Sequence, residues 1–384
     1  MIIIKNGKIY TMAGKIFENG SIIIENGIIK EIKENSETLP QGQIIDAKGK
    51  IIMPGFVEAH GHIGSCLTAT SLNEDINEMT DPITPEMRAI DSINPMDPTF
   101  KDAIQGGITT GATGPGSGNV VGGTFTVIKL HGNRIDDMVI KNPLAMKCAF
   151  GENPKRVYGN MNKMPSTRMG TAAQLRDLLF KSIEYRNKKN TAKEDPDKAP
   201  SFDIKLESML PVVNGEIPLK AHAHQADDIF TAIRIAKEFG VKLTLDHCSE
   251  GHLIAEELAK EGFPAIIGPT FGWKSKFELR NLDFKAPKIL FDAGVKIAIM
   301  TDNPVLPAES LPMCAALAYK SGLDEMEALK CITINAAQIL GINKKVGSLE
   351  VGKDADIVIW DRHPFDLQSN VIKTIVNGKV VYSK

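Results

Sequence analysis

The feature that most constrains the fold is a repeated alternation of short apolar runs and helical patterns through the middle of the chain. Six runs have the length and composition of buried strands: GITTGATG (107–114), PLAMKCAFG (143–151), IPLKAHAH (217–224), VKLTLDHC (241–248), FPAIIGPT (263–270) and VKIAIMTD (295–302). Helical patterns follow them, as in ADDIFTAIRIAKEFG (226–240), which ends at a glycine typical of a helix C-cap. Strand followed by helix over roughly 270 residues predicts a parallel sheet joined by crossovers, and an α/β fold of the (β/α)8 TIM-like barrel type fits that length.

Both ends of the chain have a different pattern. They carry β-branched runs such as GSIIIENGIIKEI (20–32) and VIKTIVNGKVVYS (371–383), with Asn-Gly pairs at 6–7, 19–20, 26–27 and 377–378. Asn-Gly between such runs is a strong signal for a β-hairpin. We therefore expect one small β-sandwich domain built from both termini, residues 1–53 and 350–384, with the barrel of residues 54–349 inserted between them.

Composition excludes several classes of partner. The formal net charge is −2, with basic and acidic residues nearly balanced, so nothing indicates a nucleic-acid surface or a membrane patch. No apolar run is long enough to span a bilayer, and the N-terminal one is too short for a signal peptide. The five cysteines are scattered and form no CxxC pair, which favours a reducing, cytoplasmic location. We expect a small-molecule substrate; formation of a homo-oligomer stays open.

Polar residues recur where the predicted strands end. In PGFVEAHGHIG (54–64), His60 and His62 are two residues apart, so in an extended strand both side chains point to the same side. Other runs end in the same manner, with His222 and His224, with Asp246 and His247, and with Asp302. The carboxyl ends of barrel strands are where active sites are built. One such histidine would be read as a core residue, but the set predicts a metal site.

Imidazole and carboxylate ligands favour a divalent metal such as zinc, bound as one or two ions. A bound metal lowers the pKa of water from 15.7 to about 7, which makes hydroxide available near neutral pH. A nearby carboxylate can take the proton during attack and pass it to a leaving nitrogen. Asp302 is the best candidate for this catalytic role.

Together with the stretch VGSLEVGKDADIVIWD (346–361), these motifs resemble the metal-dependent amidohydrolase superfamily, and most of all its imidazolonepropionase-like branch. The resemblance extends over essentially the whole chain. It implies a (β/α)8 barrel with a split β domain and hydrolysis of a carbon–nitrogen bond by metal-bound hydroxide. It also implies that the metal ligands are His60, His62, His222, His247 and Asp302.

The fourth strand departs from the family pattern. Binuclear members carry a carboxylated lysine or a glutamate there, which bridges two metals. Here Lys147 lies inside the predicted strand and Glu152 just past its end, and we favour Glu152 as the ligand because it needs no modification. A site with one metal and neither residue as ligand stays open. His224 points to the same side as His222 but lies beyond it, so we expect a substrate contact or a solvated loop residue.

Two further segments are predicted to be loops. GATGPGSGNVVGGTF (111–125) is glycine-rich and follows a strand. A phosphate cradle is one interpretation, but it matches neither GxGxxG nor a P-loop, so a substrate-facing loop at the barrel mouth is preferred. YRNKKNTAKEDPDKAPSFD (185–203) is charged and interrupted by prolines, which predicts a solvated loop or a mobile lid.

Three functions are compatible with this pattern. The leading hypothesis is a hydrolase of a non-peptide amide, and of a cyclic amide in particular. The second is a metal-dependent dipeptidase or N-acyl amino acid deacylase on the same barrel. The third is a non-catalytic scaffold that kept the fold and lost the metal, and the complete His/His/His/His/Asp set argues against it. Fold alone cannot identify the substrate.

Overall fold

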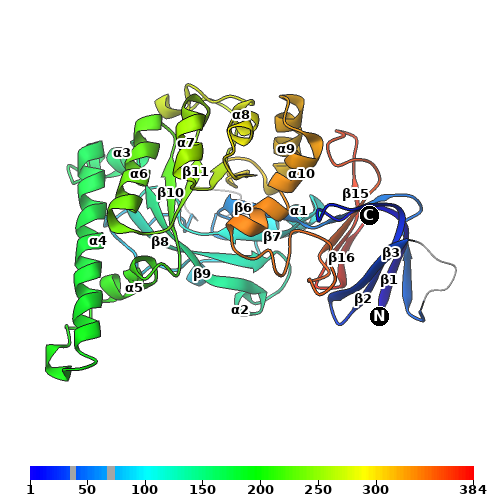
Figure 1. Cartoon of the computed structure of the whole chain (residues 1–384), viewed down its shortest axis with the longest axis horizontal. Helices are drawn as coiled ribbons and strands as arrows, with labels where there is room; N and C mark the ends of the chain where they lie inside the picture. Colours follow the sequence, from blue (N-terminus) through cyan, green and yellow to red (C-terminus); the bar gives the residue numbers. More distant parts are fainter. Residues whose placement is uncertain (35–39, 67–73) are drawn as a thin grey trace.

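The computed structural model describes residues 1–34, 40–66 and 74–384 of the chain. It contains two eight-stranded sheets, one in the middle of the sequence and one made from both ends. Figure 1 shows the terminal sheet on one side of the molecule, with the N- and C-termini close to it, and the larger helix-bearing part on the other.

The central sheet forms a nearly closed barrel. Its strands lie in the order β13-β12-β11-β10-β9-β8-β7-β6, so each strand neighbours the next one in the sequence. The two ends of this order, β6 and β13, also contact each other. The strands are β6 (Phe56–Gly61), β7 (Ile108–Thr113), β8 (Val121–Lys129), β9 (Val139–Ala149), β10 (Leu219–Ala223), β11 (Leu243–His247), β12 (Ala265–Ile267) and β13 (Ile297–Ile299).

One strand of the barrel departs from the predicted parallel arrangement. β8 is antiparallel to both β7 and β9, whereas the other neighbouring pairs of the sheet are parallel. The connections 114–120 and 130–138 that flank β8 are shorter than the dozen or so residues that a parallel crossover needs. The chain therefore turns back on itself twice before the regular strand–helix alternation resumes.

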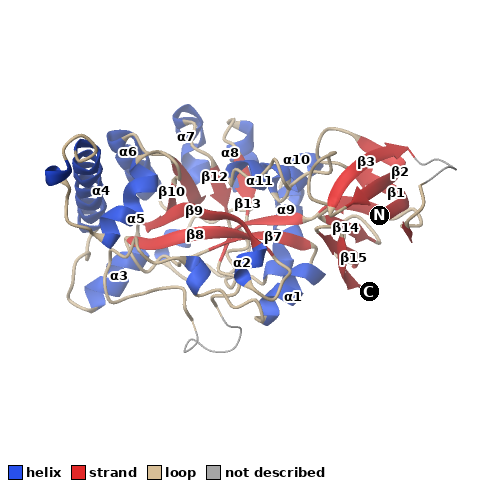
Figure 2. Cartoon of the chain, turned by 90° about the horizontal axis from the view of Figure 1, so that it is seen from below, coloured by secondary structure: helices blue, strands red, loops and turns tan. Residues whose placement is uncertain are grey.

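Helices surround the barrel sheet (Figure 2). They are α1 (Pro98–Gln105), α2 (Ile135–Met138), α3 (Glu152–Asn160), α4 (Arg168–Thr191), α5 (Ile204–Val213), α6 (Ala226–Phe239), α7 (Ala255–Glu261), α8 (Ala286–Asp292), α9 (Leu311–Lys320), α10 (Glu325–Cys331) and α11 (Ile334–Ile339). The predicted loop 185–203 is partly wrong, because α4 continues to Thr191 and buries Tyr185 on its inner face.

The terminal sheet joins strands from both ends of the chain, as expected. Its order is β16-β15-β14-β5-β1-β2-β3, with β4 also pairing with β1. The strands are β1 (Ile2–Tyr10), β2 (Ile16–Glu25), β3 (Ile28–Glu34), β4 (Gln43–Asp46), β5 (Ile51–Pro54), β14 (Ile357–Trp360), β15 (Val371–Val376) and β16 (Lys379–Ser383). They enclose an isoleucine-rich core of their own. A two-sheet sandwich and the domain boundaries near residues 53 and 350 stay predictions.

Two of the four Asn-Gly pairs form the predicted hairpin turns. Asn26-Gly27 and Asn377-Gly378 connect β2 to β3 and β15 to β16, with positive φ at both residues of each pair. The pairs at 6–7 and 19–20 instead lie inside β1 and β2, where Gly7 and Gly20 face each other across the ladder. A Cβ on Gly7 would lie 2.2 Å from Ile52 Cδ1, and one on Gly20 would lie 2.5 Å from Ile9 Cδ1. Close packing therefore explains these two glycines.

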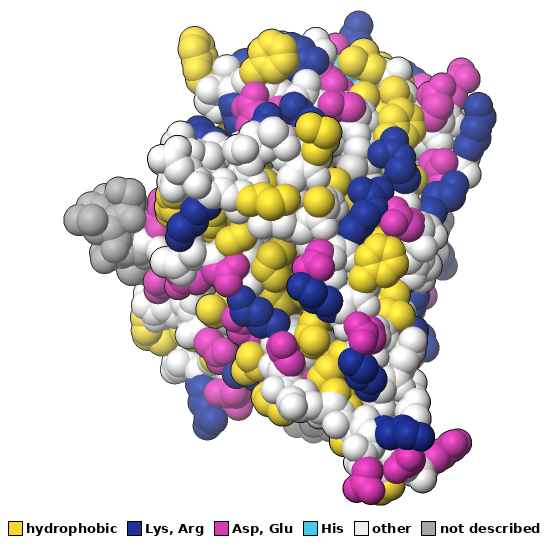
Figure 3. Space-filling view, turned by 90° about the vertical axis from the view of Figure 1, so that its left-hand side faces the viewer, with side chains coloured by type: hydrophobic (Ala, Val, Ile, Leu, Met, Phe, Trp, Pro, Cys, Tyr) yellow, Lys and Arg dark blue, Asp and Glu magenta, His cyan; other side chains and the backbone are white. Residues whose placement is uncertain are grey.

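The surface over the α4 side of the barrel mixes both signs of charge. Figure 3 shows acidic and basic side chains interspersed there with scattered apolar ones. Ion pairs such as Arg176–Glu238, Lys181–Asp177 and Lys237–Glu261 account for part of this pattern. Among the described residues, no helix combines the length and apolar character needed to cross a membrane.

Candidate metal centre and active site

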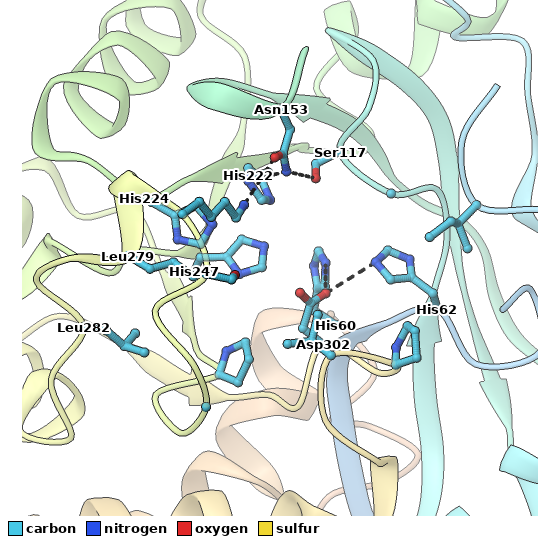
Figure 4. A pocket seen from close by; sticks show the side chains of 18 of the residues that line it. His60, His62, Ser117, Asn153, His222, His224, His247, Leu279, Leu282 and Asp302 are labelled. Atoms are coloured by element: carbon cyan, nitrogen blue, oxygen red, sulfur yellow. Dashed lines mark hydrogen bonds and ion pairs between the residues drawn. The ribbon is translucent and has the colours of Figure 1, made fainter. Parts of the chain in front are cut away.

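The carboxyl ends of the barrel strands meet in one cavity of about 400 Å³. His60 is in β6, His222 in β10 and His247 at the end of β11, while Asp302 follows β13. All four line the cavity, together with His62 and His224. Figure 4 shows their side chains converging on a common space. The structure thus brings together the histidines and the aspartate that the sequence singled out.

One group of side chains comes from β6 and the segment after β13. His60 Nε2 and His62 Nε2 each lie 3.4 Å from Asp302 Oδ1. Ligand atoms of these three residues lie within 4.8 Å of one another, which is close enough for a single metal ion. Asp302 has a left-handed backbone, with φ of 54°, which is uncommon for a residue other than glycine. This backbone conformation is a feature of the turn that presents the carboxylate to the histidines.

A second group is made of three histidines from β10 and β11. Ligand atoms of His222, His224 and His247 also lie within 4.8 Å of one another. The ring centroids of His222 and His247 are 4.3 Å apart, and those of His224 and His247 are 4.6 Å apart. The His60 ring lies 5.4 Å from the His247 ring, so the two groups are neighbours.

The hydrogen bonds of His62 and His247 leave the Nε2 atoms of these two residues for the cavity. His62 Nδ1 lies 2.7 Å from the carbonyl oxygen of Gly114, and His247 Nδ1 lies 2.8 Å from that of Gly268. A carbonyl only accepts, so Nδ1 must carry the proton and Nε2 must present a lone pair. This is the usual arrangement of metal-ligating histidines, in which an outer partner fixes the tautomer. His247 Nε2 and Asp302 Oδ1 are buried and have no hydrogen-bond partner among the described residues, so both atoms are suited to bind a cation.

The ionisation states also fit metal ligands. Burial lowers the pKa of His60 and holds the pKa values of His222 and His247 well below the ordinary value, so these imidazoles are neutral near pH 7. For Asp302, burial opposes ionisation, but His247, His60 and His62 outweigh it and hold the pKa well below the usual range. Neutral imidazoles beside an ionised carboxylate are the forms that bind divalent cations.

The structure places the two strand-four candidates differently. Lys147 is in β9 and lines the cavity, with its Nζ 3.3 Å from His60 Nε2. Burial lowers the pKa of this lysine to about 8. Glu152 does not line the cavity. Glu152 is the first residue of α3, and its backbone N–H donates to Glu278 Oε2 at 3.0 Å. The preceding residue, Gly151, has a φ of 81°, which turns the backbone away from the strand.

Comparison with known proteins identifies the family. Residues 51–381 match the model of the amidohydrolase family. The chain belongs to the amidohydrolase family. It is 41% identical to an amidohydrolase from Thermotoga maritima MSB8 of known crystal structure, with a TM-score of 0.97 over 100% of both chains.

Two curated relatives extend this comparison. An imidazolonepropionase from Symbiobacterium thermophilum is 25% identical over 453 residues, which cover 99% of this chain and 97% of that protein. The amidohydrolase tasK from Hapsidospora irregularis is 29% identical over 388 residues, which cover 94% of this chain but only 39% of that protein. The predicted likeness to the imidazolonepropionase branch is confirmed, and so is the prediction that the chain is an enzyme, an amidohydrolase.

Several residues of this amidohydrolase site were not assigned a role from the sequence. Asp246 Oδ1 accepts from Lys220 Nζ at 3.0 Å, and both side chains are buried beneath the histidines. Glu58 lies two residues before His60, and its Oε2 accepts from Thr301 Oγ1 at 2.6 Å. Glu58 could have been found from the sequence, because its spacing places it on the same side of the strand as His60.

Proposed function

We propose that this amidohydrolase cleaves a carbon–nitrogen bond of a non-peptide amide, with cyclic amides as the substrate class. The attacking water is activated at one or two divalent cations, and zinc is the expected metal. The observation that carries this proposal is the pair of metal-ligating groups that face one cavity, with outer carbonyl oxygens holding Nδ1 of His62 in one group and of His247 in the other. The likeness to imidazolonepropionases favours a cyclic amide over a dipeptide.

His60, His62 and Asp302 are the proposed ligands of one cation. His222 and His247 are the proposed ligands of the other. When bound, a divalent cation lowers the pKa of water to about 7 and supplies hydroxide near neutral pH.

Asp302 is the proposed proton carrier. Its Oδ1 faces the imidazoles of His60 and His62, so we assign the proton to the other oxygen, Oδ2. Oδ2 takes the proton of the attacking water and returns it to the leaving nitrogen. The low pKa of Asp302 keeps this group ionised, and therefore able to accept the proton, before the reaction starts.

Lys147 replaces Glu152 as the proposed strand-four ligand. The lysine lines the cavity beside His60, whereas the glutamate does not. Carboxylation requires a neutral amine, which attacks carbon dioxide and loses a proton, and a pKa of about 8 makes that neutral form accessible near pH 7. A carboxylated Lys147 would then be an oxygen ligand for a cation, as the resemblance to binuclear members of the superfamily implies.

The test combines metal analysis with a substrate screen. We expect the purified protein to bind zinc. In a screen of cyclic ureides, lactams, N-acyl amino acids and dipeptides, we expect the metal-loaded protein to hydrolyse a cyclic ureide or a lactam. Opening of a ring gives one product, whereas deacylation gives two, so product analysis separates cyclic amides from the deacylase and dipeptidase alternatives. Failure to bind a divalent metal would overturn the proposal and favour the scaffold.

A further inference from the structure

The connection between β12 and α8, residues 268–285, closes one side of the cavity with side chains that the metal chemistry does not use. Its apolar members that line the cavity are Pro269, Phe271, Trp273, Leu279 and Leu282. Trp273 is 86% exposed and Phe271 39% exposed, which is unusual for large aromatic side chains. Figure 4 shows Leu279 and Leu282 on the His247 side of the cavity, away from His62.

The same connection also supplies a lysine in a defined position. Lys276 Nζ donates to Glu278 Oε1 at 2.7 Å and to Asn153 Oδ1 at 3.3 Å. Asn153 in turn donates through Nδ2 to Ser117 Oγ at 2.7 Å. Lys276, Asn153 and Ser117 all line the cavity and come from three separate segments of the chain. The ammonium group is therefore held by its neighbours beside the metal groups.

The charges around the cavity are uneven. Of the described residues that line it, the charged ones are Lys147, Lys276 and Asp302. Lys147 and Asp302 belong to the proposed metal centre, which leaves Lys276 as the one charge available to a distant part of the substrate. Glu278 does not line the cavity: it is fully buried, and its Oε2 accepts the backbone N–H of Glu152. A group that reaches this end of the cavity meets the Lys276 ammonium, with Glu278 bound behind it at 2.7 Å, and no carboxylate other than Asp302 among the described lining residues.

We propose that Lys276 binds a carboxylate of the substrate and that Phe271, Leu279 and Leu282 receive an apolar group. The substrate would then be an amide that carries both a carboxylate and an apolar substituent. A single ammonium, without an arginine fork, suits a singly charged group better than a phosphate. This proposal rests on the proposed function, because it assumes that the amide reacts at the metal centre of the same cavity.

Matched pairs of ligands test the carboxylate directly. In the metal-loaded enzyme, N-acetyl-leucine is compared with N-acetyl-leucinamide, and a lactam carboxylate with its carboxamide. Lys276→Gln removes the charge but keeps a hydrogen-bonding side chain. Lys274→Gln is the control, because Lys274 belongs to the same connection, is exposed, and bonds only to the carbonyl oxygen of Arg280 among the described contacts.

We expect the wild-type enzyme to prefer the carboxylate member of a pair by about tenfold or more in kcat/KM, the scale of a hydrogen bond between charged groups. Lys276→Gln should raise KM for the carboxylate by about the same factor, leave kcat within about twofold, and leave the carboxamide unaffected. Lys274→Gln should behave as wild type, and Lys276→Arg should restore the preference. Metal content is measured in each variant, because loss of metal in Lys276→Gln would indicate a structural role through Glu278 and overturn the proposal.

A binding measurement separates failure of this proposal from failure of the proposed function. Calorimetry compares 4-methylpentanoate with 4-methylpentanamide in the metal-loaded wild type, in Lys276→Gln and in Lys274→Gln. Because a carboxylate can also bind a metal ion, the decisive quantity is the change in Kd between wild type and Lys276→Gln. A weakening of about tenfold for the carboxylate alone supports the proposal even if no amide is turned over. Equal Kd values in wild type and Lys276→Gln would overturn it, whatever the enzyme hydrolyses.

Discussion

The imidazole of His60 and the carboxylate of Asp246 lie 3.0 Å apart, Nδ1 to Oδ2, with both side chains completely buried. Asp246 also pairs with Lys220 at 3.0 Å. The next residue, His247, reaches the same centre from the end of β11, which strict alternation of side chains along a strand would not allow. The positive φ of His247, 74°, marks the point where the strand pattern breaks. Two adjacent residues thereby serve one site, Asp246 behind His60 and His247 in front of it.

Replacement of Asp246 tests this relationship. We expect Asp246→Asn to weaken metal binding by about 10–100-fold, because His60 loses the partner that keeps its proton on Nδ1. Metal affinity is measured by competition with a chelator. Asp356→Asn is a matched control, because Asp356 is also buried against a lysine, Lys129 at 2.7 Å, but is outside the cavity. Equal metal affinity in wild type and Asp246→Asn would show that Asp246 does not contribute to metal binding.

The residues that face the cavity were largely predictable, whereas those behind them, Glu58 apart, were not. Spacing of two along a strand and a place at the strand end were enough to single out His60, His62 and His222. The role of Asp246 could not be read in the same way, since it depends on β6 and β11 meeting across the barrel. Lys276 carried no signal either, because its position is set by Asn153 and Ser117 from distant segments.

The paired histidines of β6 give the second prediction. His62→Ala should abolish turnover and strip the metal that His60 and Asp302 share with it, while most of the fold is kept, because His62 lies at the cavity rather than in an apolar cluster. Metal analysis, activity and circular dichroism measure these outcomes. His131→Ala is the control, because His131 is exposed and does not line the cavity. Full metal occupancy in His62→Ala would show that the two histidines do not share a cation.

Lys147 and Glu152 give the third prediction. Lys147→Met should lower metal content from about two equivalents to about one if a carboxylated lysine is shared by two ions. Glu152→Gln should leave the metal content unchanged, because Glu152 does not line the cavity. Mass spectrometry of the intact wild-type protein should also detect carboxylation of the lysine. Loss of metal in Glu152→Gln would restore the glutamate as ligand, and no loss in either variant would indicate one metal.

The strand-four preference shows what the sequence alone leaves open. Glu152 has the expected distance from the strand in sequence, but distance along the chain does not give direction in space. After Ala149 the chain passes Gly151 in a left-handed conformation and enters α3 at Glu152. Because glycine adopts both hands of φ readily, the sequence alone left the direction of this turn open.

The metal-free protein should lose stability in mild acid. Burial lowers the pKa of His60, His222 and His247, and lowers that of His224 to about 3. The unfolded chain therefore binds more protons than the folded one as pH falls below about 6.5, the ordinary histidine value, so the free energy of unfolding decreases.

Glu58 acts in the opposite direction. Burial raises the pKa of Glu58 to about 7, which adds stability as pH falls from there toward 4.5. Four histidines outweigh one glutamate, so the Tm of chelator-treated protein should be lower near pH 5.5 than near pH 7.5. His224→Asn should show a shallower decrease than wild type. An equal or higher Tm at the lower pH would mean that the histidines are not held neutral by burial.

Asp302 gives the last prediction, which separates metal binding from chemistry. Asp302→Asn keeps the size of the side chain and an oxygen for the cation, but loses the basic site at Oδ2. Much of the metal should therefore stay bound, because His60 and His62 still face it. Turnover should fall by about 10²–10⁴-fold, the usual effect of losing a general acid–base group, with KM little changed, because the proton moves only in the transition state. The assay is steady-state kinetics on a substrate from the screen, with metal content measured on the same samples. A variant with normal kcat would exclude Asp302 as the proton carrier and direct attention to His224, whose Nε2 is buried at the cavity without a hydrogen-bond partner among the described residues.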